Sequence, residues 1–271
     1  MADVMMAEPS SSTSALTRRE HLAKTFEAYR AELDANTETR ERLIILSRSI
    51  TQMSKKLIFH LHRGATSGLV ARAKNIRDGK GKEKEIIANF EKIRAELGSG
   101  ESAESFWRWA RPVSPGLEEY IEAVSFLFYL ETGRLISLAE VQKGLSNPQT
   151  EEPYVVVTPE DYILGMSDLT GELMRYATNA LSTGDHETPL AVCEFVRTVK
   201  VYFDGIPPYQ LHKLSKKQDE TTRSLVKIEK VCYSLRLRLI EFADRPDILR
   251  QMASRALDDA RGDEPAGKDE E

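Results

Sequence analysis

The distribution of proline and glycine is the feature that most constrains the fold of this chain of 271 residues. Only eleven prolines and fifteen glycines occur, and they lie mainly between long stretches of helix-forming residues. Both residue types disfavour helix interiors, so helices can fill the stretches between them. Apolar residues recur there at three- and four-residue steps, the period of a helix packed on one face. The sequence therefore predicts an all-α bundle of about seven helices, without internal repeats or strands.

The first half of the chain contains four predicted helices. They cover residues 14–63, 68–97, 102–110 and 115–133. The first could be one very long helix or two helices that break near Asn36, and glycines weaken the second at residues 78–81. Pro112 and Pro115 are expected to end the third helix and begin the fourth. The fourth helix is apolar on almost every side, so it should lie at the centre of the bundle.

The second half contains three predicted helices, preceded by a loop at residues 145–154. They cover residues 159–181, 189–203 and 215–242. Thr158 is the predicted N-cap of the first of them, with Pro159 at the first helical position. Gly184 and Asp185 are expected to end that helix.

The net charge of −5 is concentrated in the last fourteen residues, 258–271, which carry seven acids and two bases. We expect these residues to form an acidic disordered tail and residues 1–13 a disordered N-terminus, with a helical domain at residues 14–257. Inside that domain, residues 40–94 carry fourteen Lys or Arg and five acids. A basic surface for a nucleic acid therefore remains, despite the acidic average.

Membrane and redox chemistry are not indicated by the sequence. No apolar run approaches the roughly 18 residues of a membrane span, and the N-terminus lacks the pattern of a secretory signal. We expect a protein of the cytoplasm and nucleus, with no membrane partner. Cys193 and Cys232 lie in apolar helical patterns, so we expect buried thiols without a disulfide or a metal.

Two pairs of acids are candidates for a metal site. Glu119 and Glu122 are three residues apart, and Asp168 and Glu172 are four apart, so each pair lies on one side of its helix. Spacing alone is weak evidence, because 43 acids supply several such pairs by chance and most are solvated helix faces. Glu119 and Glu122, however, share a face with Phe126, where an unpaired carboxylate would be costly to bury.

Four carboxylates that meet between two helices could hold one or two hard divalent cations, Mg²⁺ or Mn²⁺. Such a site hydrolyses phosphodiesters by activating water and neutralising the charge that develops. A ferritin-like di-iron centre is the competing chemistry in a helical bundle, but it requires Glu-x-x-His motifs. Neither helix has such a motif.

A row of basic side chains is predicted on the polar side of the first long helix, where it could contact nucleic-acid phosphates. These residues are Arg42, Arg48, Lys55, Lys56 and Arg63. A second basic stretch, residues 213–238, is explained equally well as a charged outer surface. We interpret the five histidines as surface or packing residues. The cluster of Phe106, Trp107 and Trp109 is interpreted as a packing or interface patch rather than a base-stacking platform.

Several segments resemble the translin family. They are FHLHR at residues 59–63, GLEEYIEAVSF at 116–126, TPEDYILGMSDLTGELMR at 158–175 and KIEKVCYSL at 227–235. The resemblance covers residues 20–243, and DLTGELMR together with EYIEAVSF favours the branch called translin-associated factor X over translin itself. The acidic tail and the short loop before Pro159 depart from the family pattern.

This resemblance implies an all-helical bundle that assembles with translin into a barrel-like hetero-octamer, in which this subunit is a Mg²⁺-dependent endoribonuclease. The implied substrates are single-stranded RNAs, including small-RNA passenger-strand fragments and precursor-tRNA fragments, and binding of single-stranded DNA is implied as well. The implied catalytic and metal-binding residues are Glu119, Glu122, Asp168 and Glu172, the same acids that the spacing suggests.

Two alternatives remain open from the sequence. The chain could be a non-catalytic scaffold that binds single-stranded RNA or DNA and stabilises translin while keeping the acids. It could also assemble with itself, or stay monomeric, with an empty acidic site. Removal of metal separates cleavage from binding, and the mass of the protein with and without translin separates the assemblies.

Overall fold

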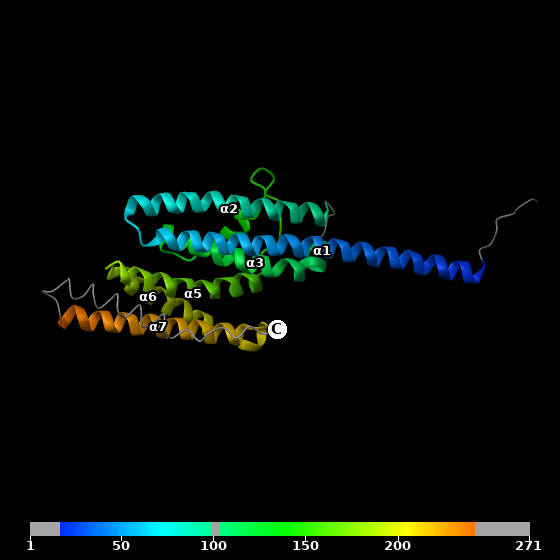
Figure 1. Ribbon diagram of the computed structural model, residues 1–271. Helices are drawn as coiled ribbons and strands as arrows, with labels where there is room; N and C mark the ends of the chain where they lie inside the picture. Colours follow the sequence, from blue (N-terminus) through cyan, green and yellow to red (C-terminus); the bar gives the residue numbers. More distant parts are fainter. Residues whose placement is uncertain (1–16, 99–102, 242–271) are drawn as a thin grey trace, which may run out of the picture. The chain divides into compact units, whose positions relative to one another are not determined.

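The computed structural model describes residues 17–98 and 103–241, and regular structure within them is almost entirely helical (Figure 1). The helices are α1 (Arg18–Ala65), α2 (Leu69–Leu97), α3 (Ala103–Thr132), α4 (Leu138–Gly144), α5 (Pro159–Ser182), α6 (Glu187–Asp204), the 3₁₀ helix η1 (Pro208–Gln210) and α7 (Leu214–Glu241). These residues contain no strand, only an isolated bridge between Ser146 and Pro153. The predicted all-α class and the helix number are confirmed. The predicted disordered ends, residues 1–13 and 258–271, lie outside the described residues.

The chain divides after Arg42 into two units, residues 1–42 and 43–271. Helix α1 is continuous, with no break at Asn36, but its buried residues begin only at Leu43. Large apolar side chains before that point, such as Phe26 and Leu33, are exposed. The hydrophobic core therefore belongs to the second unit.

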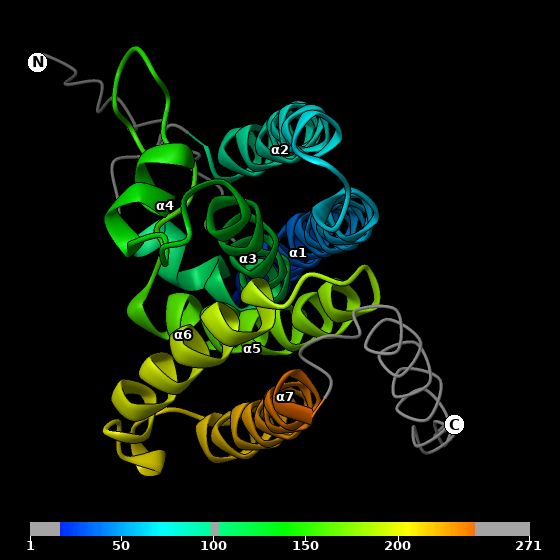
Figure 2. The same cartoon turned by 90° about the vertical axis from the view of Figure 1, so that its left-hand side faces the viewer.

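Helices α3 and α5 form the centre of the second unit (Figure 2). They pack extensively against each other, and α5 packs on its other side against α6 and α7, while α2 packs against α3. The main hydrophobic cluster joins fully buried side chains from separate helices, for example Phe90, Tyr120, Leu169 and Val192. Each large apolar side chain buried in this way stabilises the fold by about 1.5–3 kcal/mol. The predicted central position of the apolar helix is confirmed.

The predicted break at Pro112 and Pro115 is wrong, because α3 continues through both residues. A proline inside a helix removes a backbone donor and tends to kink the helix rather than always ending it. Here α1 supplies extra hydrogen bonds: the Ser47 hydroxyl donates to the carbonyl of Val113 at 3.3 Å and accepts from the N–H of Gly116 at 3.0 Å. Tertiary contacts thus outweigh the local effect of the two prolines.

Helix α5 begins where the sequence predicts. The hydroxyl of Thr158 accepts a hydrogen bond from the N–H of Asp161, and Pro159 opens the helix. One turn further on, Gly165 lies directly against α3, since a Cβ atom at this position would be 2.6 Å from the carbonyl oxygen of Glu118. This glycine lets the two helix backbones approach closely just before the acids of α5.

The remaining elements match the predicted ones with small shifts. Helix α2 is continuous through residues 78–81, and α6 begins at Glu187, close to the predicted start. Helix α4 was not predicted, although Ser137 and Glu140 form a complete capping box at its start. None of the described helices combines the length and the hydropathy needed to cross a membrane.

Candidate functional site

The structure brings the four predicted acids to one cavity of about 510 Å³ in the second unit. Glu119 and Glu122 reach it from α3, and Asp168 and Glu172 reach it from α5. The other residues that line it are Lys55, Ile58 and Phe59 from α1 and Arg175 from α5. Each acid pair occupies one side of its helix, and the contact between α3 and α5 turns both pairs toward the same space.

Three of the four carboxylates have a basic or imidazole partner. Nζ of Lys55 lies 3.2 Å from Oε1 of Glu119. Lys217, at the start of α7, forms an ion pair with Asp168, and Nε2 of His62 hydrogen-bonds with Oε2 of Glu172. Side chains from α1 and α7 therefore compensate part of the negative charge of the cavity.

The carboxyl group of Glu122 has no hydrogen bond and no ion pair with any residue in the described part of the chain. Burial, together with the nearby charges of Asp168, Glu172 and Glu119, raises the pKa of this carboxyl group to about 8, although the charge of Lys217 acts in the opposite direction. Without an added cation, Glu122 is therefore largely protonated at neutral pH.

Asp168 and Lys217 form a partly buried ion pair in the site. Burial, together with the charges of Glu220 and Glu172, raises the pKa of Asp168, although its hydrogen bond and ion pair with Lys217 act to lower it. At Lys217, burial acts to lower the pKa of the ammonium group, but the contact with Asp168 and the charges of Glu220 and Glu118 together raise it. Lys217 is therefore charged at neutral pH and remains a counter-ion within the acidic cluster.

His62 is a site residue that the sequence interpretation missed. Its side chain is buried, its ring lies 4.7 Å from the ring of Phe126, and its Nδ1 atom has no hydrogen-bond partner among the described residues. The prediction of a packing role is correct as far as it goes, but the same ring also contacts Glu172. No local pattern relates His62 to an acid 110 residues later in the chain.

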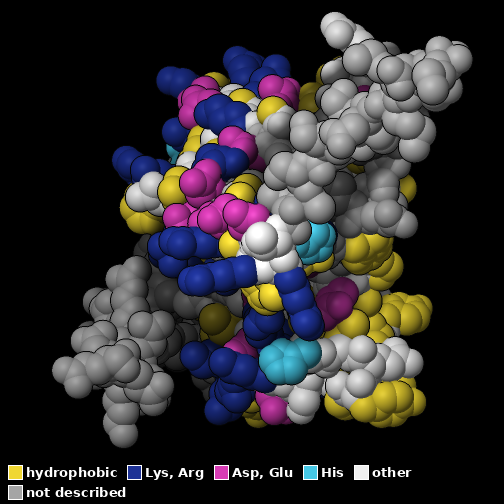
Figure 3. Space-filling model, turned by 90° about the vertical axis from the view of Figure 1, so that its right-hand side faces the viewer, with side chains coloured by type: hydrophobic (Ala, Val, Ile, Leu, Met, Phe, Trp, Pro, Cys, Tyr) yellow, Lys and Arg dark blue, Asp and Glu magenta, His cyan; other side chains and the backbone are white. Residues whose placement is uncertain are grey.

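The predicted basic row on α1 is distributed over both units. Four of its members are exposed on the part of α1 that belongs to the second unit: Arg48, Lys55, Lys56 and Arg63. A step of seven residues places Arg48 on the same side of the helix as Lys55, and another places Lys56 on the same side as Arg63. Arg42 is the last residue of the first unit, and its Nη1 atom lies 3.9 Å from Oε2 of Glu38. Figure 3 shows Lys and Arg side chains interspersed with Asp and Glu side chains on the surface of the chain.

The donor set of the cavity fits a hard divalent cation by its chemistry. Carboxylate oxygens are the ligands that Mg²⁺ and Mn²⁺ prefer, and Glu122 is a half-buried carboxyl group without a direct ion-pair partner among the described residues. Within residues 17–98 and 103–241, no three such side chains already converge as a formed metal site. Coordination therefore requires the carboxylates to exchange contacts with Lys55, Lys217 or His62 for contacts with the ion.

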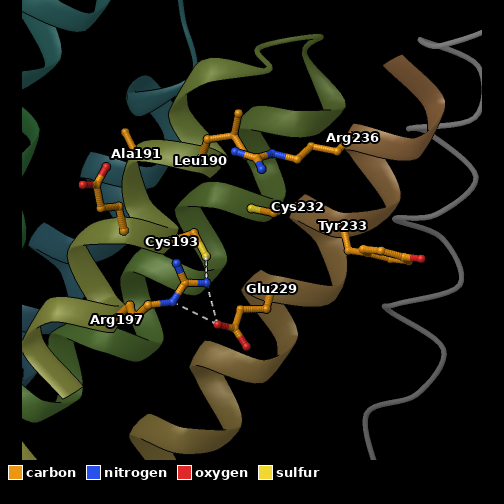
Figure 4. A pocket seen from close by; sticks show the side chains of 9 residues that line it. Leu190, Ala191, Cys193, Arg197, Glu229, Cys232, Tyr233 and Arg236 are labelled. Atoms are coloured by element: carbon orange, nitrogen blue, oxygen red, sulfur yellow. Dashed lines mark hydrogen bonds and ion pairs between the residues drawn. The ribbon is translucent and has the colours of Figure 1, made fainter. Parts of the chain in front are cut away.

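A second cavity, of about 620 Å³, lies between α6 and α7 and contains both cysteines (Figure 4). Arg197 donates two hydrogen bonds to Glu229, at 3.2 and 2.7 Å, and the Cys232 thiol donates to the carbonyl of Pro189 at 3.3 Å. Burial, reinforced by Cys193, raises the pKa of Cys232 to about 12. The protonated thiol is a poor nucleophile. The prediction of buried free thiols is confirmed, and the carboxylate cavity remains the candidate site.

Comparison with known proteins identifies the family of this chain. Residues 38–239 match the model of the Translin family. The chain belongs to the translin family. Translin-associated protein X from Mus musculus is 35% identical over an alignment of 235 residues that covers 79% of this chain and 78% of the mouse protein. The Translin-associated protein X homolog from Schizosaccharomyces pombe is 30% identical and covers 80% of this chain and 89% of its own length.

The sequence resemblance to one branch of the translin family is also confirmed. Translin from Gallus gallus is 25% identical over 79% of this chain and 91% of its own length, which is below the identity of the proteins called Translin-associated protein X. Among solved structures, AfC3PO has a TM-score of 0.59 at 20% identity, covering 80% of this chain and 99% of its own. AfC3PO in complex with duplex RNA has a TM-score of 0.56 at 19% identity, and the match covers 89% of this chain and 100% of the AfC3PO chain. These structures have the same fold as this translin-family chain.

Proposed function

We propose that this chain is the catalytic subunit of a metal-dependent endoribonuclease that cleaves single-stranded RNA together with translin. The observation that carries the proposal is the convergence of four carboxylates on one cavity that is also lined by basic side chains. The relatives called Translin-associated protein X support the proposed branch. The AfC3PO complex with duplex RNA supports RNA as the class of ligand. Single-stranded DNA is a second ligand that the same basic surface could bind.

Glu119, Glu122, Asp168 and Glu172 would hold Mg²⁺ or Mn²⁺ in this proposal. The bound ion would supply a Lewis acid for the phosphate group and lower the pKa of a water molecule. Lys217 and His62 would hold the acids of α5 in position through their contacts with Asp168 and Glu172.

The basic row would hold the RNA backbone. Lys55 lies at the cavity itself. The exposed side chains of Arg48, Lys56 and Arg63 would contact phosphates on either side of it, together with Arg42. Phosphate contacts of this kind position a strand without reading its sequence.

Assembly with translin, in a hetero-octamer, is part of the proposal. Exposed apolar side chains support an oligomer, since Val201 is 66%, Tyr202 76% and Tyr209 87% exposed. The mass of the full chain, measured alone and with translin, tests this part. A complex of eight subunits is the expected result, and a chain that stays monomeric in the presence of translin would contradict it.

The catalytic assignment is tested with Glu122→Gln and Asp168→Asn in the complex with translin. Each variant should assemble normally and cleave single-stranded RNA at least about 100-fold more slowly with Mg²⁺, the scale on which catalytic metal sites respond to changes near the ion. Glu131→Gln is the matched control, because Glu131 lies on α3 outside the cavity and pairs with Lys80. Wild-type cleavage rates in both cavity variants would overturn the assignment.

A non-catalytic scaffold is the second candidate, and one observation favours it. The contacts of Lys55, Lys217 and His62 satisfy three of the four acids without a metal, so the acids could serve only to join α1, α3, α5 and α7. A scaffold should bind RNA equally well with and without EDTA and should never cut it. Cleavage that stops on chelation and returns with Mg²⁺ would exclude this candidate.

A further inference from the structure

Among the residues that line the carboxylate cavity and take no part in its ion pairs, two carry groups that suit a nucleotide ligand. One is Arg175, which follows Asp168 by seven residues and Glu172 by three, and so lies on the same side of α5 as both acids. Lys55 and Lys217 are each engaged by a carboxylate. Arg175 is exposed and has no hydrogen bond or ion pair with any other described residue. Its guanidinium group is therefore available to a ligand in the cavity.

The other residue is Phe59, on the wall formed by α1. Its side chain is 58% exposed, whereas the neighbouring Leu57 and Leu61 are fully buried, so Phe59 contributes little to the core. It follows Lys55 by four residues and precedes Arg63 by four, which places it within the basic row. An exposed aromatic ring among basic side chains is the arrangement by which proteins hold unpaired nucleotides.

The chemistry of these two groups is complementary to a single nucleotide unit. A guanidinium group binds a phosphate through two parallel hydrogen bonds, which an ammonium group cannot reproduce. An aromatic ring stacks on the face of a base only when that face is free. In a duplex both faces of a base are covered by its neighbours.

We infer that Phe59 and Arg175 select an unpaired nucleotide at the cleavage site, with Phe59 stacked on a base next to the cleaved bond and Arg175 bound to a phosphate in the cavity. The inference rests on the proposed function and explains how that site prefers a single strand to a duplex. It places a base-recognising group on α1 and a phosphate-recognising group on α5, on walls of the same cavity as the four acids.

Phe59 is tested with Phe59→Leu and Phe59→Trp in the full complex with translin. On single-stranded RNA, Phe59→Leu should raise KM about 10-fold, while Phe59→Trp should stay close to wild type. The sharper test uses RNAs in which one nucleotide at a time is replaced by an abasic unit. In the wild type, an abasic unit at one position beside the cleaved bond should lower kcat/KM about 10-fold. In Phe59→Leu, an abasic unit at that position should lower kcat/KM no further. Equal losses for both proteins at every position would overturn the role of Phe59.

Arg175 is tested with Arg175→Ala and Arg175→Lys, and Arg111→Ala on α3 is an exposed control outside the cavity. Arg175→Ala should lower kcat/KM about 100-fold, and lysine should restore only part of that loss. Arg111→Ala should match the wild type. An Arg175→Ala protein within twofold of the wild type would overturn the role of Arg175.

A binding measurement keeps this inference separate from the proposed catalysis. Fluorescence anisotropy in EDTA measures the affinity for single-stranded RNA without cleavage, and Phe59→Leu and Arg175→Ala should each weaken it at least about fivefold. If the wild-type complex does not cut RNA with Mg²⁺, the proposed function fails, while the anisotropy still tests the two residues. Unchanged affinity in both variants would overturn the inference alone.

Discussion

Glu122→Gln is expected to raise the free energy of unfolding of the metal-free protein. Burial, with the charges of Asp168 and Glu172, raises the pKa of Glu122 from 4.5 to about 8. Between these values the folded state keeps a proton that the unfolded chain has released, so stability falls as the pH rises from 4.5 to 8. At about 1.4 kcal/mol for each pKa unit, the penalty at pH 7 is on the order of 3 kcal/mol. Glutamine has nearly the same size but cannot ionise, so it removes most of this penalty.

The assay is urea unfolding followed by circular dichroism in EDTA, for the wild type and the variant at pH 5, 7 and 8. The difference between the two proteins should be small at pH 5, grow to about 2–3 kcal/mol at pH 7 and be larger at pH 8. Glu119→Gln is the control, because it removes the contact with Lys55 and should not stabilise the protein. Equal stability of Glu122→Gln and the wild type at all three pH values would refute the reasoning.

Three further predictions concern the stability of the fold. Gly165→Ala should lower the free energy of unfolding by about 1–3 kcal/mol, because the new Cβ would meet the backbone of α3. Gly171→Ala on the same helix, where a Cβ has no atom within 4 Å, should raise it by about 0.5–1 kcal/mol. Urea unfolding compares the two variants, and equal effects would count against the close approach. Ser47→Ala should lower the free energy of unfolding by about 1–3 kcal/mol, because two hydrogen bonds to α3 disappear. An unchanged melting temperature would contradict this. Deletion of residues 1–42 should leave a cooperative helical fold by circular dichroism, since no described residue before Leu43 is buried, and a molten chain would disprove it.

The helices could be predicted where local signals act alone. Thr158 and Pro159 mark the start of α5 because a cap and a first-turn proline depend only on neighbouring backbone groups. Pro112 and Pro115 gave a wrong boundary because their effect is balanced by Ser47, which is 66 residues from Val113 in the sequence. A short element such as α4 offers too few residues for a periodic pattern, although its capping box is visible in the sequence.

The site could be predicted only in part for the same reason. The four acids are recognisable as two helical pairs, but spacing does not say which pairs meet. Their partners are remote in sequence: Lys217 follows Asp168 by 49 residues, and His62 precedes Glu172 by 110. Such contacts depend on how α1, α3, α5 and α7 pack, and no local pattern specifies that packing.

The close approach at Gly165 has a consequence for comparing relatives. Gly165 has no side chain that could contact the four acids. It nevertheless sets how near the backbones of α3 and α5 come, and therefore the width of the space between the two acid pairs. A relative with a larger residue at this position would keep the acids and the helices but hold the pairs further apart. The identity of one small residue would then distinguish relatives with a narrow acidic cavity from those that have only inherited its acids.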